Sequence, residues 1–344
     1  MPPARRLLLH IGHPKTGTTS LQETLQWSHE CLLGQSILHP QTDGSEPGNN
    51  KDLAPHFLGP PAAGSSNPGR DTTRDQNDPT RTARAWDRFV SELHDRRPDT
   101  VVISSEYLFR AIRPAQRAHF SATLRSIATD LEIIAYLRSP ASFYLSALNQ
   151  RLKFYRPVRV RQGCWLRPVL EPMMQLPPAR VSLNLYDRSL MTGGDTVQDF
   201  FARYLPDFDT ARLTRVERER NTTISTEAMA LLQASHCGEL DLSQNKHRAA
   251  RAICEADRGI PYPTLPDYYP EARQAAINRA SADLLWLRDV HDLTFPDIDY
   301  GRIRPAPGHD PMSGPPRIED ICPIDPQRKA ELLALARRNI RGVQ

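Results

Sequence analysis

Residues 6–19 read RLLLHIGHPKTGTT, and this stretch decides the fold class. Its first half, residues 6–12, is a short apolar run that ends at a glycine, which is typical of a buried strand. The loop HPKTGTTS follows, and beyond it Leu21, Leu25 and Leu32 recur near helical spacing. The stretch therefore predicts a strand, a tight loop and a helix in direct succession.

Four further short apolar runs predict strands, at residues 36–40 (SILHP), 100–105 (TVVISS), 132–138 (EIIAYLR) and 181–186 (VSLNLY). Helical patterns separate or follow them, at residues 86–93, 114–129, 140–153, 226–236, 272–291 and 326–341. Strands that alternate with helices predict an α/β fold, here a central parallel sheet of about five strands flanked by helices, a P-loop NTPase-like three-layer sandwich. In such sheets, ligands bind outside the carboxyl ends of the strands.

The chain organisation is interpreted as one domain over residues 1–344. Residues 41–82 are rich in Gly, Pro, Asn and Asp and predict a long irregular loop. Residues 205–344 are mainly helical, and we expect them to pack on the same domain. Ser139 and Ser225 are expected to cap the helices that follow them, since serine is a preferred N-cap residue.

The composition excludes several classes of protein. Among the 344 residues, 39% are hydrophobic and 24% charged, and the net charge of +4 is too small to indicate a nucleic-acid-binding surface. The five cysteines form no C-x-x-C pair, which speaks against a zinc or redox site and favours free thiols. The apolar run 7–11 is too short for a signal peptide, and no stretch reaches the ~20 apolar residues of a membrane span. We therefore expect a cytoplasmic protein without a membrane span.

The loop 12–19 has the context of a phosphate cradle, because it follows a strand and opens a helix. Its glycines fit the spacing of the nucleoside-triphosphate loop G-x-x-x-x-G-K-[ST], but Thr18 stands where the lysine belongs and Lys15 lies three residues earlier. Kinases and NTPases also need an acidic residue for Mg²⁺, and the strand 132–138 ends in Arg138 instead. An Mg-dependent P-loop kinase or NTPase and a non-catalytic nucleotide-binding module remain alternatives.

The segment PKTGTTSLQ (14–22) resembles the 5′-phosphosulfate loop of the sulfotransferase family that uses 3′-phosphoadenosine 5′-phosphosulfate (PAPS). The segment YLRSPASFYLSALNQ (136–150) resembles the same family's 3′-phosphate motif, and RNTTISTEAMALL (220–232) is weakly similar to a stretch of its bacterial branch. The resemblance implies sulfuryl transfer from PAPS to an acceptor hydroxyl or amine, with 3′-phosphoadenosine 5′-phosphate (PAP) as product and no metal. It implies that the cofactor is bound by Pro14, Lys15, Thr16, Gly17, Thr18, Thr19, Arg138, Ser146 and Arg220, although a solvated surface is an equal interpretation of Arg220.

Sulfuryl transfer to a hydroxyl requires a general base near Lys15. Position favours Glu106, just after the strand 100–105, where the cytosolic eukaryotic relatives carry a histidine. The alternative for Glu106 is an ion pair with an arginine. His56 and then Asp52, both in the long loop, are the rival bases.

The acceptor side is indicated by residues 151–167, where six basic side chains are interleaved with Phe154, Tyr155 and Trp165. Aromatic faces suit sugar rings and arginines suit acidic groups, so a saccharide, glycolipid or acidic small molecule is expected. A solvated basic surface is the equal alternative. Closure of the loop 41–82 over the acceptor is a further hypothesis, and the sequence does not predict the oligomeric state.

Overall fold

The computed structural model describes residues 1–42, 46–59, 79–154, 166–176, 179–215, 223–243, 245–261, 264–305 and 316–341. The chain divides into two compact units, each described below by itself. The first comprises Met1–Arg138 and Leu166–Glu217, and the second Ser139–Trp165 and Arg218–Gln344. The packing of the helical C-terminal part on the first unit stays a prediction.

A five-stranded sheet in the order β2-β3-β1-β4-β5 forms the centre of the first unit, and every neighbouring pair is parallel. Its strands are β1 (Ala4–His10), β2 (Ile37–Leu38), β3 (Thr100–Ser104), β4 (Ala128–Leu137) and β5 (Arg180–Leu185). The α/β fold predicted from the sequence is thus confirmed. The central strand β1 lies between β3 and β4, so the residues that follow these three strands meet at one edge of the sheet.

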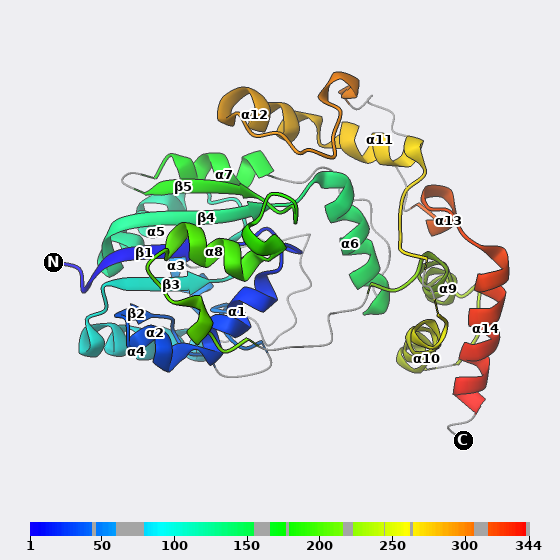
Figure 1. Cartoon of the computed structure of the whole chain (residues 1–344), viewed down its shortest axis with the longest axis horizontal. Helices are drawn as coiled ribbons and strands as arrows, with labels where there is room; N and C mark the ends of the chain where they lie inside the picture. Colours follow the sequence, from blue (N-terminus) through cyan, green and yellow to red (C-terminus); the bar gives the residue numbers. More distant parts are fainter. Residues whose placement is uncertain are drawn as a thin grey trace. The chain divides into compact units, whose positions relative to one another are not determined.

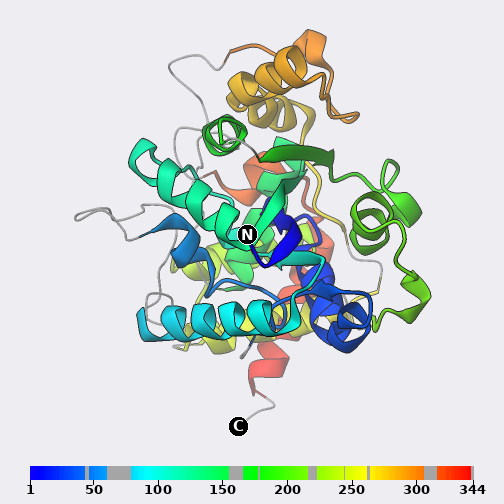
Figure 2. The same cartoon turned by 90° about the vertical axis from the view of Figure 1, so that its left-hand side faces the viewer.

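Helices cover both faces of this sheet (Figures 1 and 2). One face carries α1 (Thr18–Trp27), α2 (His29–Leu33) and α8 (Thr196–Tyr204), and the other carries α3 (Ala54–Leu58), α4 (Pro79–Arg96) and α5 (Pro114–Ile127). α7 (Leu166–Met174) packs against β5. Leu8, Val102 and Ile134 point to the α1 and α8 side, where they form one buried cluster with Phe200 and Phe201. Alternation along each strand therefore supplies apolar side chains to both layers.

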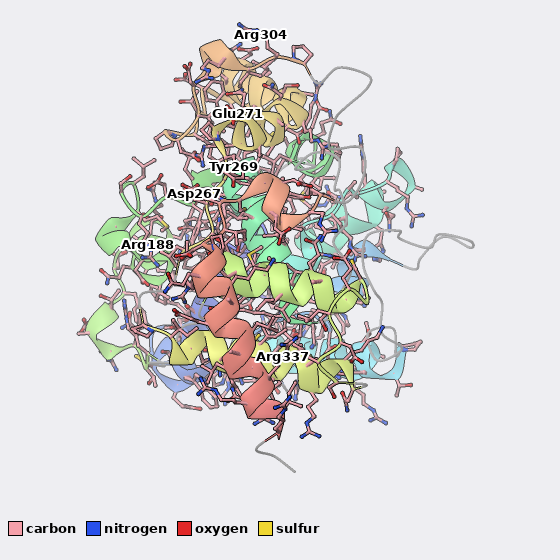
Figure 3. The ribbon with its side chains drawn as sticks, turned by 90° about the vertical axis from the view of Figure 1, so that its right-hand side faces the viewer. Arg188, Asp267, Tyr269, Glu271, Arg304 and Arg337 are labelled. Carbon is pink, nitrogen blue, oxygen red and sulfur yellow. The ribbon has the colours of Figure 1, made fainter. Side chains whose placement is uncertain are left out.

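The described residues of the second unit form helices joined by loops and contain no strand. It contains α6 (Pro140–Lys153), α9 (Thr226–His236), α10 (Lys246–Gly259), α11 (Pro270–Arg279), α12 (Ser281–His291), α13 (Ile318–Ile321) and α14 (Pro326–Arg341). α10 packs against α9 and α14. Figure 3 shows the exposed side chains of Glu271 at the start of α11 and of Arg337 on α14.

Buried charges hold α9, α10 and α14 together. Arg328, at 8% exposure, lies 3.4 Å from Oε2 of Glu227 and 3.6 Å from Oδ1 of Asp257. Ser225 caps α9 as predicted, because its Oγ accepts from the backbone N–H of Ala228. The same hydroxyl donates to Asp257, so the cap and the ion cluster form one network.

Two predictions about local structure are wrong. The pattern at 272–291 predicted one helix, but the helix is interrupted at Ala280 and forms α11 and α12. The interruption was missed because the apolar spacing continues across it. The segment 41–82 is not irregular throughout, because α3 and the start of α4 lie within it. In the described part of the chain, no helix is both long and apolar enough to cross a bilayer.

Candidate functional site

The loop between β1 and α1 contains three residues with left-handed backbone conformation. Gly12 has a φ of 74°, Lys15 of 74° and Gly17 of 73°. Glycine adopts this conformation freely, whereas a lysine in it costs about 1–2 kcal/mol. Turns that include left-handed residues can gather backbone N–H groups into a concavity that binds anions.

The carbonyl groups of this loop are held by side chains. Thr16 donates through Oγ1 to the carbonyl of His13 at 2.6 Å, Arg138 donates through Nη1 to the carbonyl of Lys15 at 3.0 Å, and Thr196 donates through Oγ1 to the carbonyl of Thr16 at 3.3 Å. The first N–H groups of α1 have no partner within the helix, and its dipole favours negative charge at this end. The loop is therefore suited to a phosphate or sulfate group.

Gly17 is required by the approach of α8 to the loop. A Cβ atom at Gly17 would lie 2.5 Å from Oγ1 of Thr196 and 3.5 Å from Cε2 of Tyr186. Thr196 begins α8, and Tyr186 directly follows β5. Neither residue was predicted for the site. The sequence signal that could have pointed to Tyr186 is its place at the carboxyl end of the predicted strand 181–186.

Glu106 reaches the loop from the end of β3. Its Oε2 accepts a hydrogen bond of 2.8 Å from Oγ1 of Thr18, the first residue of α1. A Cβ atom at Gly12 would lie 3.2 Å from both Cβ of Glu106 and Cγ2 of Thr18, so the glycine permits this contact. Among the described residues, the hydrogen-bond partner of this carboxylate is a hydroxyl and not an arginine. The structure thus brings the first-ranked base to the predicted phosphate loop.

Two buried asparagines hold the end of β3. Ser105 Oγ donates to Oδ1 of Asn49 at 3.1 Å, and the backbone N–H of Ser104 donates to Oδ1 of Asn50 at 2.9 Å. Ser105 in turn caps the short helix η2 (Glu106–Leu108) by accepting from the N–H of Tyr107. The asparagine pair was not predicted, because the strand end that it holds is distant in the sequence.

The segment that carries these asparagines also packs against α1. Gly48 has a φ of 71°, and a Cβ atom there would lie 1.8 Å from the carbonyl oxygen of Gln22. At the ends of β1 and β3, Nδ1 of His10 lies 2.8 Å from Oγ of Ser104. The same Oγ accepts a hydrogen bond of 3.3 Å from Nε2 of Gln22. Burial lowers the pKa of His10 to about 3, so this imidazole is neutral at physiological pH. A neutral, hydrogen-bonded layer therefore supports the site.

Arg138 follows β4 and is held at the loop by three contacts. Besides its hydrogen bond to Lys15, its backbone N–H donates to Nδ1 of His13 at 3.4 Å, and its guanidinium lies 5.6 Å from the centre of the Tyr186 ring. A guanidinium over an aromatic face is stabilised by the ring quadrupole. This arginine is therefore placed where it can add positive charge beside the anion loop.

The remaining predicted cofactor residues are placed as follows. In the loop, Pro14 is half-buried and Thr19 is exposed. Ser146 lies half-buried in α6, within the second unit, and its part in a 3′-phosphate site stays a prediction. Arg220 lies outside the described residues. Ser139 precedes α6 as expected, but the prediction that it caps this helix is wrong: its side chain accepts no hydrogen bond from the first turn and instead donates to Oδ2 of Asp297 at 2.8 Å.

The rival bases have other partners. His56 lies on α3 with its ring stacked on Trp86 at 3.6 Å between centroids, and its carbonyl accepts from Nε2 of His119. Burial, followed by the nearby His119, lowers the pKa of His56. Asp52 forms an ion pair of 2.8 Å with Arg81. These contacts favour a packing role for His56 and a structural ion pair for Asp52.

Only the ends of the proposed acceptor segment are described, since residues 155–165 lie outside. Phe154 is 64% exposed, and burial lowers the pKa of Lys153. Arg167 forms an ion pair with Glu171 one helical turn away. An acceptor role for the segment stays a prediction.

Searches against protein-family models, curated proteins and solved structures found no match for this chain. Its chemistry is therefore argued from the residues themselves. The described site combines the loop 12–19, which carries Lys15, with a carboxylate that follows β3 and a guanidinium that follows β4. Such a set can hold a phosphorylated or sulfated group and can accept a proton beside it.

Proposed function

We propose that this chain transfers the sulfuryl group of PAPS to the hydroxyl or amine of an acceptor. The observation that carries the proposal is that Arg138 and Glu106 are both hydrogen-bonded to the loop that contains Lys15. In the proposed reaction, the side chains of Lys15 and Arg138 bind the anionic donor, and the carboxylate of Glu106 takes the proton of the acceptor. The resemblance of residues 14–22 and 136–150 to the sulfotransferase motifs supports PAPS as that donor.

The hydrogen-bond donors and positive charges of the site suit PAPS, which carries several anionic groups. The N–H groups at the start of α1 and the side chains of Lys15, Thr18 and Thr19 would hold the 5′-phosphosulfate, and the guanidinium of Arg138 would contribute to binding of the 3′-phosphate. PAPS supplies an activated sulfur with a phosphate leaving group. The ammonium of Lys15 offsets negative charge on the leaving oxygen, and Glu106 accepts the acceptor's proton.

A saccharide or acidic acceptor is part of the proposal, carried by the basic and aromatic segment 151–167. We also propose a reducing, cytoplasmic location. The four cysteines among the described residues, Cys31, Cys237, Cys254 and Cys322, are free thiols, which supports such a compartment.

Mg-dependent phosphoryl transfer is the second candidate, and one observation favours it. The end of β4, one place for a metal-binding acid, carries Arg138 instead. The sheet order puts β3 on the other side of β1, and its end supplies Glu106 to the loop. A carboxylate therefore is available for a metal ion. The position of Lys15, before the second glycine of the loop, still favours the sulfotransferase proposal.

Calorimetric titrations with PAP, and with ATP in the presence and absence of Mg²⁺, distinguish the two candidates. The sulfotransferase proposal predicts tight, metal-independent binding of PAP and weak binding of ATP. Incubation with ³⁵S-labelled PAPS and a panel of glycans, glycolipids and small alcohols should then yield a labelled product without metal. Binding of Mg·ATP in strong preference to PAP would overturn the proposal in favour of the kinase or NTPase.

Three variants test the residue roles. Lys15→Ala and Arg138→Ala should each abolish turnover, whereas Glu106→Gln should reduce turnover by about 100-fold or more while PAP still binds. Glu30→Gln, on the exposed face of α2, is the matched control for the lost charge and should behave as wild type. Full activity of Glu106→Gln would refute the assignment of the base.

A further inference from the structure

The hydroxyl of Thr18 donates to Glu106 in the structure, and a bound anion would be a second acceptor that competes for it. Thr18 is only 3% exposed, and its Oγ1 donates to Glu106. It is also the first residue of α1, at the helix end that favours an anion. A threonine hydroxyl has one hydrogen, whereas carboxylate and phosphate oxygens can only accept. Thr18 therefore cannot donate to Glu106 and to a bound anion at the same time.

The backbone that carries Glu106 is held in place. Its Cα would lie 3.4 Å from a Cβ atom on Gly12, and the preceding Ser105 is hydrogen-bonded to Asn49 and to the N–H of Tyr107. The hydroxyl of Thr18 can turn, because threonine in a helix populates two χ1 rotamers. Rotation of the hydroxyl is thus the simplest way to change the contact.

We infer that Thr18 is a positioning residue that links anion binding to the release of Glu106. Its hydroxyl either holds Oε2 of Glu106 or turns to an anion in the loop, and in the second case Oε2 is free to accept the acceptor's proton. This inference rests on the proposed function, since it assumes that Glu106 is the base. It predicts that the phosphorylated donor binds before the acceptor.

Competition for the Thr18 hydroxyl changes the affinity for an anion, and this affinity can be measured without an activity assay. With its carboxylate, Glu106 competes with an anion for the Thr18 hydroxyl and also repels it. Glu106→Gln should therefore tighten anion binding by about tenfold, and Thr18→Val should weaken it by about tenfold. In the Thr18→Val background the shared hydroxyl is gone, so Glu106→Gln should tighten binding by about threefold or less, through lost repulsion alone.

The test is a double-mutant cycle by calorimetry, with PAP as one probe and pyrophosphate as the other. Thr18→Val keeps the shape of the side chain, and circular dichroism checks that each variant is folded. Thr18→Ser should restore the coupling between positions 18 and 106, which a purely structural role would not require. Glu30→Gln on α2 should leave both affinities unchanged.

Coupling between positions 18 and 106 of less than about twofold would overturn the inference, because that is the scatter expected of independent sites. Weaker anion binding by Glu106→Gln would also overturn it. If PAP binds no more tightly than pyrophosphate and PAPS is not turned over, the proposed function fails, while the pyrophosphate cycle still decides the role of Thr18. If neither anion binds, both proposals fall.

Discussion

Gly17→Ala tests whether the contact between α8 and the loop shapes the site. A methyl group at this position would lie 2.5 Å from Oγ1 of Thr196, and the backbone would keep a φ near 73°. The left-handed conformation costs an alanine about 1–2 kcal/mol. Displacing Thr196 removes its hydrogen bond to Thr16, about 1 kcal/mol, and overpacking adds about 1–3 kcal/mol. The expected loss is about 3–6 kcal/mol of unfolding free energy.

Gly194→Ala is the matched control in the same unit. Gly194 has a φ of 64°, but the nearest atom to its added Cβ is the carbonyl oxygen of Arg188 at 3.4 Å, an ordinary contact. Only backbone strain remains, so this variant should lose about 1–2 kcal/mol. Urea denaturation followed by circular dichroism measures both variants, and calorimetry with PAP should show that only Gly17→Ala weakens binding, by about tenfold or more.

Thr196→Ala sharpens the comparison, because it removes the atom that the new methyl group would strike. Cβ of residue 196 would still lie 3.2 Å from the new methyl group. In that background the cost of Gly17→Ala should therefore fall to about 1–2 kcal/mol for the strain of the backbone, plus a small remainder for this contact. Equal losses of stability for Gly17→Ala and Gly194→Ala would refute the reasoning. So would a cost of Gly17→Ala that is unchanged by the truncation of Thr196.

Three further predictions concern single charged residues. Arg138→Lys keeps the charge but loses the planar fork, so PAP affinity measured by calorimetry should fall about tenfold, and wild-type affinity would contradict this. Burial raises the pKa of Asp199, but hydrogen bonds, first of all from Arg203, hold it below 3.8 overall. The stability that Asp199 contributes is therefore present near neutral pH and lost as the pH falls through the lowered pKa. Asp199→Asn should cost about 2 kcal/mol at neutral pH and progressively less below pH 3.8, as urea titrations can check; a pH-independent cost would argue against it. Arg328→Met leaves the fully buried Glu227 without its ion pair and should destabilise the helical unit by about 3–5 kcal/mol in urea denaturation, whereas a loss under 1 kcal/mol would mean that the pair adds little.

The elements of the sheet could be predicted because each carries its own local pattern. The run at residues 6–12 and the glycine loop after it gave β1, the turn and α1 from neighbouring residues alone. Strand ends were less certain, and β4 begins at Ala128, four residues before the predicted start, because Thr129 and Asp130 interrupt the apolar run. Hydrophobic periodicity reports burial, and polar strand ends are not buried.

The contacts within the site could not be predicted to the same degree, because they join distant parts of the chain. The lateral order of parallel strands is not written in any one segment, so the approach of Glu106 to Thr18 was inferred only in outline. A metal-binding acid was expected only at the end of β4, whereas β3, on the other side of β1, supplies the carboxylate of Glu106. Asn49 and Asn50 were missed because their partners lie more than fifty residues away.

The left-handed backbone at Lys15 sets two requirements of this residue against each other. Glycine would relieve most of the strain, and a chain selected only for thermal endurance would be expected to replace the lysine. The proposed transfer needs an ammonium group here, and only a lysine in this unfavourable backbone conformation supplies it. At residue 15, selection for heat resistance alone would thus favour glycine, whereas selection for the proposed transfer would keep lysine.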